Sequence, residues 1–542
     1  MSAELVLAVV AAADLCLKYG KALTVVYRDI KGAEEGVRSK LLLVEAIWSK
    51  TAAQVNFLKR VAGVLEEEHC RIHLEILQVL QGKLNISISK IESVVKGGSS
   101  GSEVKRWKYA RLREAIDDSI SELQQWQSIF DPTWYLILRM GNRFIDDELS
   151  KQSDELAVET LSLQTSSASS SGNSALASAQ DLRHTLKGYG GSAMHISLPE
   201  NGLEWGTARG VEYSTTVLVK RQGSDKVFAV DTISCRAEYD MLRVRTDAEG
   251  LAKKLKRDDI GIFGLLSCKG VVKRKDADTR RLASLSLVFQ LPPTFHNTAA
   301  TPVSLRTHLL RERSFSVSRV LDVAKQLARA VSFVHTVDFV HKNIRPETIL
   351  VFPDHDSGSP SELGSAFLQG FDSFRNINFH TLKMGDEAWE RNLYRHPSRQ
   401  GLQAQEAYIM QHDVYSLGVC LLEMGLWDSF VLYGSPLDDE TKREKVPVPG
   451  RRRLGGGLES VPCEVGDIAG KMKVKDELVS LARSRLPLCM GSRYAAVVVT
   501  CLTCLDEDTE EFRGEDMQDE DGILVGVRFI EKVLVCLGEI VI

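Results

Sequence analysis

The polar residues best suited to chemistry lie between Val340 and Leu350, in a segment whose ends are apolar. The segment carries an imidazole at His341, an amide at Asn343 and a hydroxyl at Thr348. An amide is neutral near pH 7, so Asn343 cannot take a proton from a hydroxyl group as a positioned carboxylate would. The sequence therefore predicts the scaffold of a reaction site without its general base.

This segment resembles the catalytic loop of protein kinases, His-Arg-Asp-Leu-Lys-Pro-Glu-Asn-Ile-Leu. The match keeps His341, the Pro346–Glu347 pair and the apolar ends. In kinases the Asp accepts the proton of the substrate hydroxyl, and the Asn holds a magnesium ion. Asn343 and Thr348 occupy these two positions. The resemblance implies a kinase-type site from which the reactive groups are missing.

The resemblance extends over about residues 200–510. Asp231 falls where kinases have the Lys of Val-Ala-Ile-Lys, and a carboxylate there would repel nucleotide phosphates. Lys220 and Lys226 are close in sequence and remain alternatives for that role. No GxGxxG precedes these residues, so a phosphate-covering glycine loop is not predicted.

Gly370, Phe371 and Asp372 lie where kinases have Asp-Phe-Gly. The magnesium-binding Asp becomes Gly370, and the Phe is kept as Phe371. A shifted metal role for Asp372 is one alternative. We favour the other, in which its carboxylate orders the loop by bonding to nearby backbone amides.

The residues of the resemblance that hold a kinase together are better preserved: His341, Phe371, Asp413 and Arg493. In kinases the equivalent of Asp413 is buried, so we expect its carboxylate to bond to the backbone around His341. Arg493 stands where kinases have the Arg that pairs with an activation-segment Glu. Ser398 replaces that Glu, so we expect Arg493 to be unpaired.

Four positions are degenerate together: Asn343, Thr348, Gly370 and Asp231. Phosphoryl transfer depends on positioned charge, so their joint loss argues against an enzyme. We expect a pseudokinase with no catalytic residue, no metal site and no required cofactor. ATP binding without hydrolysis is left open. The alternative is an active, divergent Ser/Thr protein kinase that uses ATP.

The elements that must position these residues begin at about residue 192 and follow the order strand, strand, helix, strand, strand. The predicted elements are Thr215–Arg221, Lys226–Thr232, Ala237–Leu255, Gly261–Cys268 and Leu285–Phe289. This is the order of a kinase small lobe, which we place at 192–293. A mainly helical large lobe with insertions is expected at 294–542, which gives an α+β bilobal, protein-kinase-like fold.

Residues 1–150 are predicted to form an all-α helical bundle, because apolar residues recur at steps of three and four. The predicted helices include Val37–Leu58, Leu77–Val95, Tyr109–Leu123 and Trp134–Leu149. Asp131–Pro132 is predicted to end the fourth helix. The opening run, Leu5–Ala13, is apolar on every side, which suits either the centre of a bundle or lipid.

The bundle resembles the HeLo domain of fungal heterokaryon-incompatibility and prion-inhibition and propagation proteins, through its apolar first helix and Trp126–Leu136. A Ser-rich linker, which includes Thr165–Ser174, and a brace helix together cover 151–191 and would join it to the pseudokinase. The layout is similar to that of the mixed lineage kinase domain-like proteins of animals and their fungal counterparts. The resemblance implies a cell-death effector controlled by a pseudokinase.

Two segments are candidates for membrane contact. The first is apolar: Leu5, Val6, Leu7, Val9 and Val10. The second is basic and interleaved with aromatics: Lys105, Arg106 and Lys108. Basic side chains near an anionic membrane each contribute about 1 kcal/mol of binding. A solvated helix face is the simpler interpretation of the basic run.

The net charge of −5 gives no sign of nucleic-acid binding, and 10 scattered cysteines indicate a reducing compartment. The N-terminus does not look like a signal peptide. We expect a cytoplasmic protein that moves to an anionic membrane on activation. Expected partners are a second copy, through the bundle, and an upstream signalling protein. A non-enzymatic scaffold, whose bundle only mediates assembly, is the remaining alternative.

Overall fold

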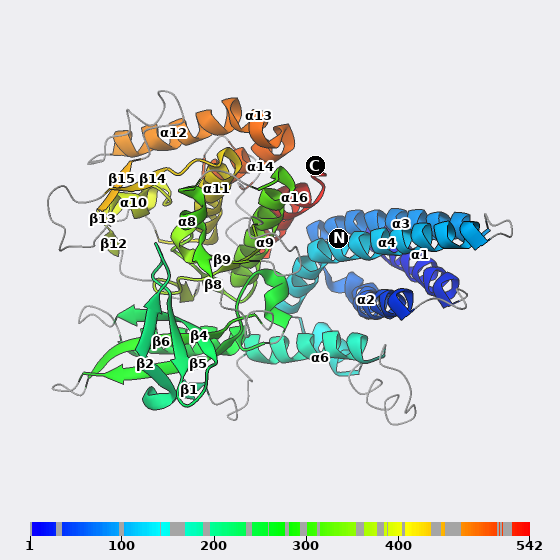
Figure 1. The fold of residues 1–542 in the computed structure, drawn as a ribbon, viewed down its shortest axis with the longest axis horizontal. Helices are drawn as coiled ribbons and strands as arrows, with labels where there is room; N and C mark the ends of the chain where they lie inside the picture. Colours follow the sequence, from blue (N-terminus) through cyan, green and yellow to red (C-terminus); the bar gives the residue numbers. More distant parts are fainter. Residues whose placement is uncertain are drawn as a thin grey trace. The chain divides into compact units, whose positions relative to one another are not determined.

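The computed structural model describes residues 3–28, 35–96, 102–140, 142–151, 169–187, 196–234, 241–257, 259–276, 281–292, 301–311, 315–353, 363–376, 384–386, 388–403, 407–434, 446–449, 468–506, 509, 512 and 523–541. The chain divides into two compact units, 1–190 and 191–542. The first is helical and the second contains the sheets (Figure 1). A helical N-terminal region followed by a sheet-containing region is what the sequence predicts.

Long helices build the first unit: α1 (Ala3–Arg28), α2 (Glu35–Val61), α3 (Glu67–Lys96) and α4 (Ser102–Arg139), with a 3₁₀ turn η1 (Ala62–Val64). A further helical stretch covers 143–151. α1 packs on α2 and α3, and α4 packs on α2 and α3. Each helix contributes one buried stripe to a shared core, as the three-and-four spacing predicts.

The predicted break at Asp131–Pro132 is wrong, because α4 continues through the proline to Arg139. The Asp131 carboxylate is buried and accepts hydrogen bonds from Lys50 Nζ at 2.8 Å and Gln54 Nε2 at 2.9 Å. Packing and these bonds on α2 outweigh the single backbone bond that a proline removes. The predicted fifth helix accordingly loses its first residues to α4.

α6 (Ser169–Leu186) packs on α2 and α4, within the first unit. It begins inside the stretch predicted to be a linker, so Ser169–Ser174 are helical and not linker. Arg183, which is buried, anchors it: Nε donates to Asp146 Oδ1 at 2.7 Å and Nη1 to the Leu138 carbonyl at 2.6 Å. Residues 152–168 of the predicted linker lie outside the described residues.

The second unit opens with a six-stranded sheet of order β1-β5-β6-β4-β3-β2. The strands are β1 (Ser197–Leu198), β2 (Leu203–Gly210), β3 (Val217–Arg221), β4 (Val227–Ser234), β5 (Cys268–Lys275) and β6 (Leu282–Gln290). The short turn η2 (Glu200–Gly202) joins β1, at one edge, directly to β2, at the other. The sheet therefore curls on itself around an apolar core: Leu203, Val219, Phe228, Val230, Val272 and Val288.

The predicted strand Gly261–Cys268 is wrong. Its first part is a 3₁₀ turn, η3 (Asp259–Phe263), and the strand begins only at Cys268. The turn is buried at Ile260 and Phe263, and a short apolar run looks the same in sequence whether a strand or a turn buries it. The predicted helix is present as α7 (Met241–Leu255), which packs on β5 and β6.

Helices dominate the rest of the second unit: α8 (Leu305–Leu309), α9 (Val317–Thr336), α10 (Trp389–Asn392), α11 (Met410–Leu426), α12 (Ile468–Ser484), α13 (Leu486–Met490), α14 (Ser492–Leu502), α15 (Ile523–Phe529), the π-helix η10 (Ile530–Val535) and α16 (Cys536–Gly538). α11 is buried along almost its whole length and packs on α9 and α14. The loop of the candidate site is attached to this helix.

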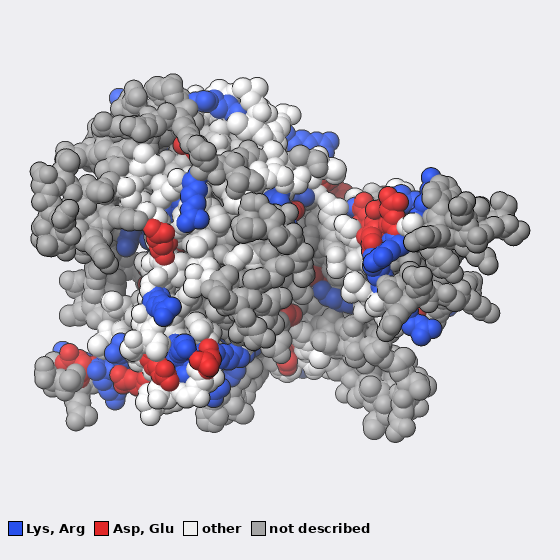
Figure 2. Space-filling view, in the orientation of Figure 1, with Lys and Arg blue, Asp and Glu red and all other residues white. Residues whose placement is uncertain are grey.

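Short strands complete the second unit. They are β7 (Val303–Ser304), β9 (Ile349–Phe352) and β10 (Ser365–Leu368) in one sheet, with the pairs β8 (Phe339–Val340) and β11 (Arg375–Asn376), β12 (Met384–Asp386) and β13 (Gly401–Gln403), and β14 (Val431–Gly434) and β15 (Val446–Pro449). On the face shown in Figure 2, acidic and basic side chains are interspersed over the six-stranded sheet.

Candidate functional site

The loop singled out by its sequence runs between β8 and β9 and ends in a 3₁₀ turn, η5 (Pro346–Thr348). β9 pairs with β10, which leads directly into Gly370 and Phe371. β8 pairs with β11, which follows those residues. Two segments far apart in sequence are thus held side by side by two short ladders.

Asp413 pins this loop to α11. Its buried carboxylate accepts backbone N–H bonds from His341 at 2.7 Å and Lys342 at 2.9 Å. The Tyr408 hydroxyl donates to it at 2.7 Å, and His335 Nε2 lies 3.1 Å away. Burial alone would raise the pKa of the Asp413 carboxyl, but His335 and the other donors lower it overall. The predicted bond between Asp413 and the backbone around His341 is present.

Asn343 and Thr348 are tied into the loop by their own side chains. Asn343 Nδ2 donates to Asp372 Oδ1 at 2.8 Å, and its Oδ1 accepts from Arg345 Nε at 2.9 Å. The Thr348 hydroxyl lies 2.8 Å from the Asn343 carbonyl oxygen and 2.9 Å from that of Arg345. The sequence predicts that Asp372 bonds to backbone amides. Its contacts among the described residues are instead with side chains, the Asn343 amide and the Ser373 hydroxyl, which donates to Oδ1 at 3.0 Å.

Asp231, on β4, reaches the Gly370–Phe371 segment beside this loop. Its carboxylate is 1% exposed and accepts the backbone N–H groups of Gly370 at 2.8 Å and Phe371 at 3.1 Å. The Thr216 hydroxyl donates to its other oxygen at 2.6 Å. The position that the resemblance assigns to a phosphate-binding lysine therefore holds a carboxylate that binds protein backbone.

The two alternative lysines are engaged elsewhere. Lys220 Nζ pairs with the exposed Asp225 at 2.8 Å. Lys226 Nζ lies over the Phe228 ring, 5.7 Å from its centroid. Phe228 belongs to the apolar core of the sheet, whereas Asp231 points to the opposite face of β4.

Gly370 has φ of +79°, a backbone conformation that favours glycine. A Cβ added there would lie 2.3 Å from Thr348 Cγ2 and 2.7 Å from Thr348 Cβ. No side chain fits at 370 while Thr348 is present. The losses at the two positions that bind magnesium in kinases are thus sterically coupled.

The loop between β2 and β3 contacts residues near Glu347. The Glu212 carbonyl accepts a hydrogen bond from Ser304 Oγ at 2.7 Å. The Tyr213 ring packs against that of Tyr433, with centroids 4.5 Å apart. The Tyr433 hydroxyl donates to Glu347 Oε1 at 3.0 Å, so the sheet-side loop is docked on the helical part of the unit. Sequence reasoning missed Tyr213 and Tyr433, because neither carries a local signal of its role. In the structure Tyr213 has a left-handed φ of +52°.

A buried ion network lies behind Glu347. Arg306 has no exposed side-chain surface and donates from Nε to Glu347 Oε1 at 2.8 Å. Its Nη1 and Nη2 reach the Glu423 carboxylate and the Tyr394 hydroxyl, which itself donates to Glu423 at 2.6 Å. The sequence showed Glu347 within its Pro-Glu pair but gave no sign of its partner Arg306.

Of the other residues expected in the core, Phe371 and His341 are buried and Arg493 is not. Phe371 is buried, with its ring centroid 4.7 Å from that of His341 and 5.8 Å from that of Phe289. Burial lowers the pKa of His341 to about 4, so its imidazole is neutral. Arg493 is the correction: its side chain is 74% exposed and lies 4.0 Å from Glu539, so it supports no buried core. Ser398, which replaces the Glu that pairs with this Arg in kinases, has its hydroxyl within hydrogen-bond distance of His396 and His412.

The membrane candidates of the bundle lie partly inside it. In α1, Val9 is fully buried and Leu7 is 67% exposed, while Leu5, Val6 and Val10 are intermediate. The apolar run therefore packs in the bundle with Val9 inward. Lys105, Arg106 and Lys108 are on α4, but their side chains lie outside what is described. None of the described helices is long and apolar enough to cross a membrane.

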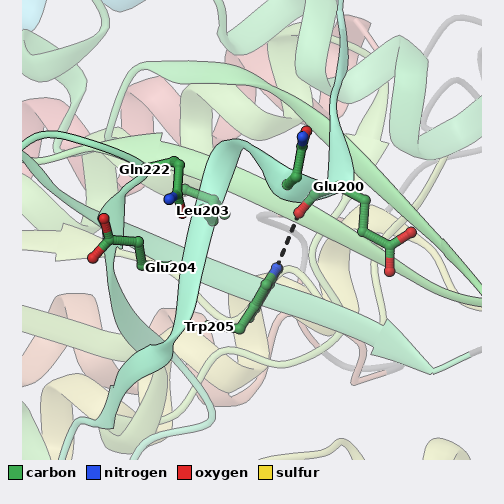
Figure 3. Close-up of a pocket in the computed structure, with 6 residues that line it drawn as sticks. Glu200, Leu203, Glu204, Trp205 and Gln222 are labelled. Carbon is green, nitrogen blue, oxygen red and sulfur yellow. Dashed lines mark hydrogen bonds between the residues drawn. The ribbon is translucent and has the colours of Figure 1, made fainter.

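A shallow hollow of about 700 Å³ opens at η2 and β2, away from the residues expected to do chemistry. Figure 3 shows its lining, with Glu204 and Gln222 on one side and Glu200 on the other. The Trp205 indole donates to the Glu200 carbonyl at 3.3 Å. Among the described residues no group of three or more His, Cys, Asp or Glu is placed to hold a metal ion.

No known protein family model matches the chain. A probable serine/threonine-protein kinase of Dictyostelium discoideum is 26% identical over 171 residues. The match covers 31% of this chain and 9% of that protein. It supports a kinase-like character for part of the chain. The HeLo resemblance of the bundle has no such support.

Asp231 should make stability depend on pH. Burial raises the pKa of its carboxyl to about 6, above the ordinary 3.8. The stabilisation from its bound proton is therefore full below about pH 4 and is lost as pH rises through 6. Between pH 5 and pH 7.5 this group should lower the free energy of unfolding by about 1.4 kcal/mol.

Urea unfolding of wild type and Asp231→Asn at both pH values measures this contribution. The stability gap between the two proteins should change by that amount, since the variant keeps every other titrating group. Asp225→Asn is the control, because Asp225 is exposed. An identical gap at pH 5 and pH 7.5 would show that Asp231 does not titrate in this range.

Proposed function

We propose that residues 191–542 form a protein-kinase-like fold that does not transfer phosphate and that controls the helical bundle as a switch. One observation carries the proposal: the Asp231 carboxylate is bonded to the Gly370 and Phe371 amides. It occupies the position where a kinase needs a cation next to the nucleotide phosphates. The weak similarity to a probable protein kinase agrees with this assignment.

The electrostatics of the site argue against phosphoryl transfer. Two like charges 4 Å apart repel by roughly 1 kcal/mol in water and about 4 kcal/mol near a protein surface. Asp231 is held by three hydrogen bonds and cannot turn away without stranding two buried amides. Gly370 cannot regain a metal-binding carboxylate, because Thr348 fills the space. A nucleotide would therefore meet the negative charge of Asp231 and no metal-binding carboxylate at position 370.

The docked loop supports a role in holding a conformation. Contacts from Glu212 and Tyr213 join the sheet to the helical part. These contacts stabilise one arrangement of the sheet relative to the helical part of the second unit. A binding partner that favours another arrangement would shift the population towards that arrangement.

The decisive assay incubates the purified full chain with ATP and magnesium. We expect no phosphate on the protein itself or on a generic substrate, and no magnesium-dependent thermal shift with ATP. Asn343→Ala is the matched control, because it separates this site from a contaminating kinase. Turnover that Asn343→Ala abolishes would establish the alternative, an active divergent kinase.

For the first unit we propose a HeLo-type effector of cell-death signalling that acts at anionic membranes and self-associates. The exposed Leu7 beside the buried Val9 shows that α1 has apolar surface beyond its core stripe. Leakage of anionic liposomes by the full chain and by residues 1–190 tests this. A charged tag placed before Leu5 should weaken leakage. Binding or assembly without any leakage would favour the scaffold alternative.

A further inference from the structure

Two histidines of α3 lie in the core of the first unit without hydrogen-bond partners. His69 is 3% exposed and His73 is 1% exposed. Both ring nitrogens of each lack a partner among the described residues. The His73 ring packs edge-on against Phe130, with centroids 6.0 Å apart. Buried polar groups are normally hydrogen-bonded, so two buried imidazoles without hydrogen-bond partners require an explanation.

The spacing places the two rings on one face of the helix, since residues four apart are neighbours. In the neutral form each imidazole ring is largely apolar, and the core can accommodate it. In the protonated form two cations would face each other inside the bundle, with no carboxylate hydrogen-bonded to either ring among the described residues. An unpaired charge is far more costly to bury than a neutral ring.

The position of α1 along α3 follows from the contacts that the two helices make before and after the two histidines. Leu5 and Ala8 of α1 line a hollow with Glu67 and Glu68 at the start of α3. Further along, the Cys16 thiol donates to the Leu77 carbonyl at 3.2 Å. α1 and α3 therefore run parallel, and the stretch of α1 level with His69 and His73 is the apolar run, including Val9 and Ala12.

The charged groups around the pair are accounted for on each element. On α3 itself, Arg71 pairs with Glu68 and Glu75. From α1 and α4, the helices that pack on α3, Glu4 lines the hollow with Glu67 and Glu68, and Asp131, next to Phe130, is paired with Lys50. Other acidic groups of these two helices are also paired with lysines: Asp14 with Lys59 and Asp117 with Lys40, while Glu122 and Asp118 pair with Lys83 and Lys90, more than two turns beyond His73 on α3. Glu68 raises the pKa of His69 against the effect of burial, whereas the neighbouring His69 lowers the pKa of His73 further.

We propose that His69 and His73 form an acid-sensitive lock, which holds the apolar run of α1 on α3 and releases it when the pair is protonated. This goes beyond the proposed function, because it concerns how the bundle opens rather than what it then does. Metal binding is a weaker explanation, since no third ligand completes a site among the described residues.

The sign of the pH effect follows from burial. Burial lowers the pKa of His69 to about 4 and that of His73 to about 3, the latter helped by repulsion from His69. In the unfolded chain both would titrate near their ordinary 6.5. The stabilisation is thus full above pH 6.5 and is lost as pH falls. At pH 5.5 each histidine should reduce the closed-to-open ratio about tenfold, and the pair about 100-fold.

Hydrogen exchange of the full chain, measured by mass spectrometry at pH 7.5 and 5.5 and corrected for intrinsic exchange, tests the lock. Protection of α1 peptides should fall about 100-fold at pH 5.5 in wild type. It should fall far less in the double variant His69→Leu with His73→Leu. His184→Gln is the control, since His184 is exposed on α6, and it should behave as wild type.

The outcomes are separable from those of the membrane proposal, because no lipid is present. Unchanged α1 protection at pH 5.5 overturns the lock, as does an equal loss in the double variant. If the double variant does not fold, carbon NMR of the labelled histidines in wild type decides. Two imidazoles that titrate below pH 5 support the lock, and two that titrate near 6.5 overturn it.

Discussion

Replacing Arg306 with methionine should destabilise the second unit by about 3–5 kcal/mol. The guanidinium is completely buried and joins Glu347 to Glu423, and it donates to Ser429 Oγ at 2.6 Å. Burial opposes its charge, but the two carboxylates raise the pKa of Arg306 well above its ordinary value. Methionine fills a similar volume, leaves Glu423 in the core without its cation, and leaves Glu347 with Arg345, whose Nη1 lies 3.5 Å away.

Urea unfolding of the full chain measures the loss. Arg493→Met is the matched control, because that side chain is 74% exposed and should change stability by no more than about 0.5 kcal/mol. Adding Glu423→Gln to Arg306→Met should recover part of the loss, since one stranded charge is then removed. A loss below 1 kcal/mol for Arg306→Met alone would mean that the network carries little of the fold.

The parts of the fold that could be predicted from the sequence are those with long, regular patterns. α2 and α3 each repeat an apolar stripe over many turns, so their periodicity identifies them. The run at 261–268 is short and apolar throughout, and nothing local separates a strand from the 3₁₀ turn that forms. Pro132 is a strong local helix breaker, but burial of the residues around it is a tertiary effect.

The candidate site shows the same division. Asn343, Thr348, Gly370 and Asp231 could be found because a short motif flags each position separately. Their mutual contacts could not, since Asp231 and Gly370 are 139 residues apart in the chain. In sequence the four changes look like four independent losses. In the structure Thr348 excludes a side chain at 370, and the freed amide of Gly370 is taken by Asp231.

The residues that sequence reasoning missed are those that have only distant partners. Arg306 meets Glu423 across 117 residues, and Tyr213 meets Tyr433 across a still longer separation. A single arginine or tyrosine carries no local signal of burial. The same holds for His69 and His73, whose spacing suggests a shared face but whose lack of partners is visible only in the packed bundle.

Asp413→Ala should cost about 3–5 kcal/mol of stability, because it removes the acceptor of a buried, charge-assisted set of hydrogen bonds. The His341 and Lys342 amides, the Tyr408 hydroxyl and His335 all point at this one carboxylate. Each buried donor left without an acceptor costs about 1–3 kcal/mol, and the losses are not fully additive. Asp413→Asn keeps one acceptor oxygen and should lose less.

The measurement is urea unfolding of the full chain near pH 7, with hydrogen exchange at the 341–342 amides as a local readout. Asp225→Ala is the control, because its carboxylate is exposed and paired with Lys220 at the surface. The pKa of the Asp413 carboxyl is lowered, so its stabilisation is present above about pH 4 and is lost as pH falls further. The gap between wild type and Asp413→Ala should therefore narrow in acid. An unchanged melting temperature, with both amides still protected in the variant, would mean that the loop is held by something other than Asp413.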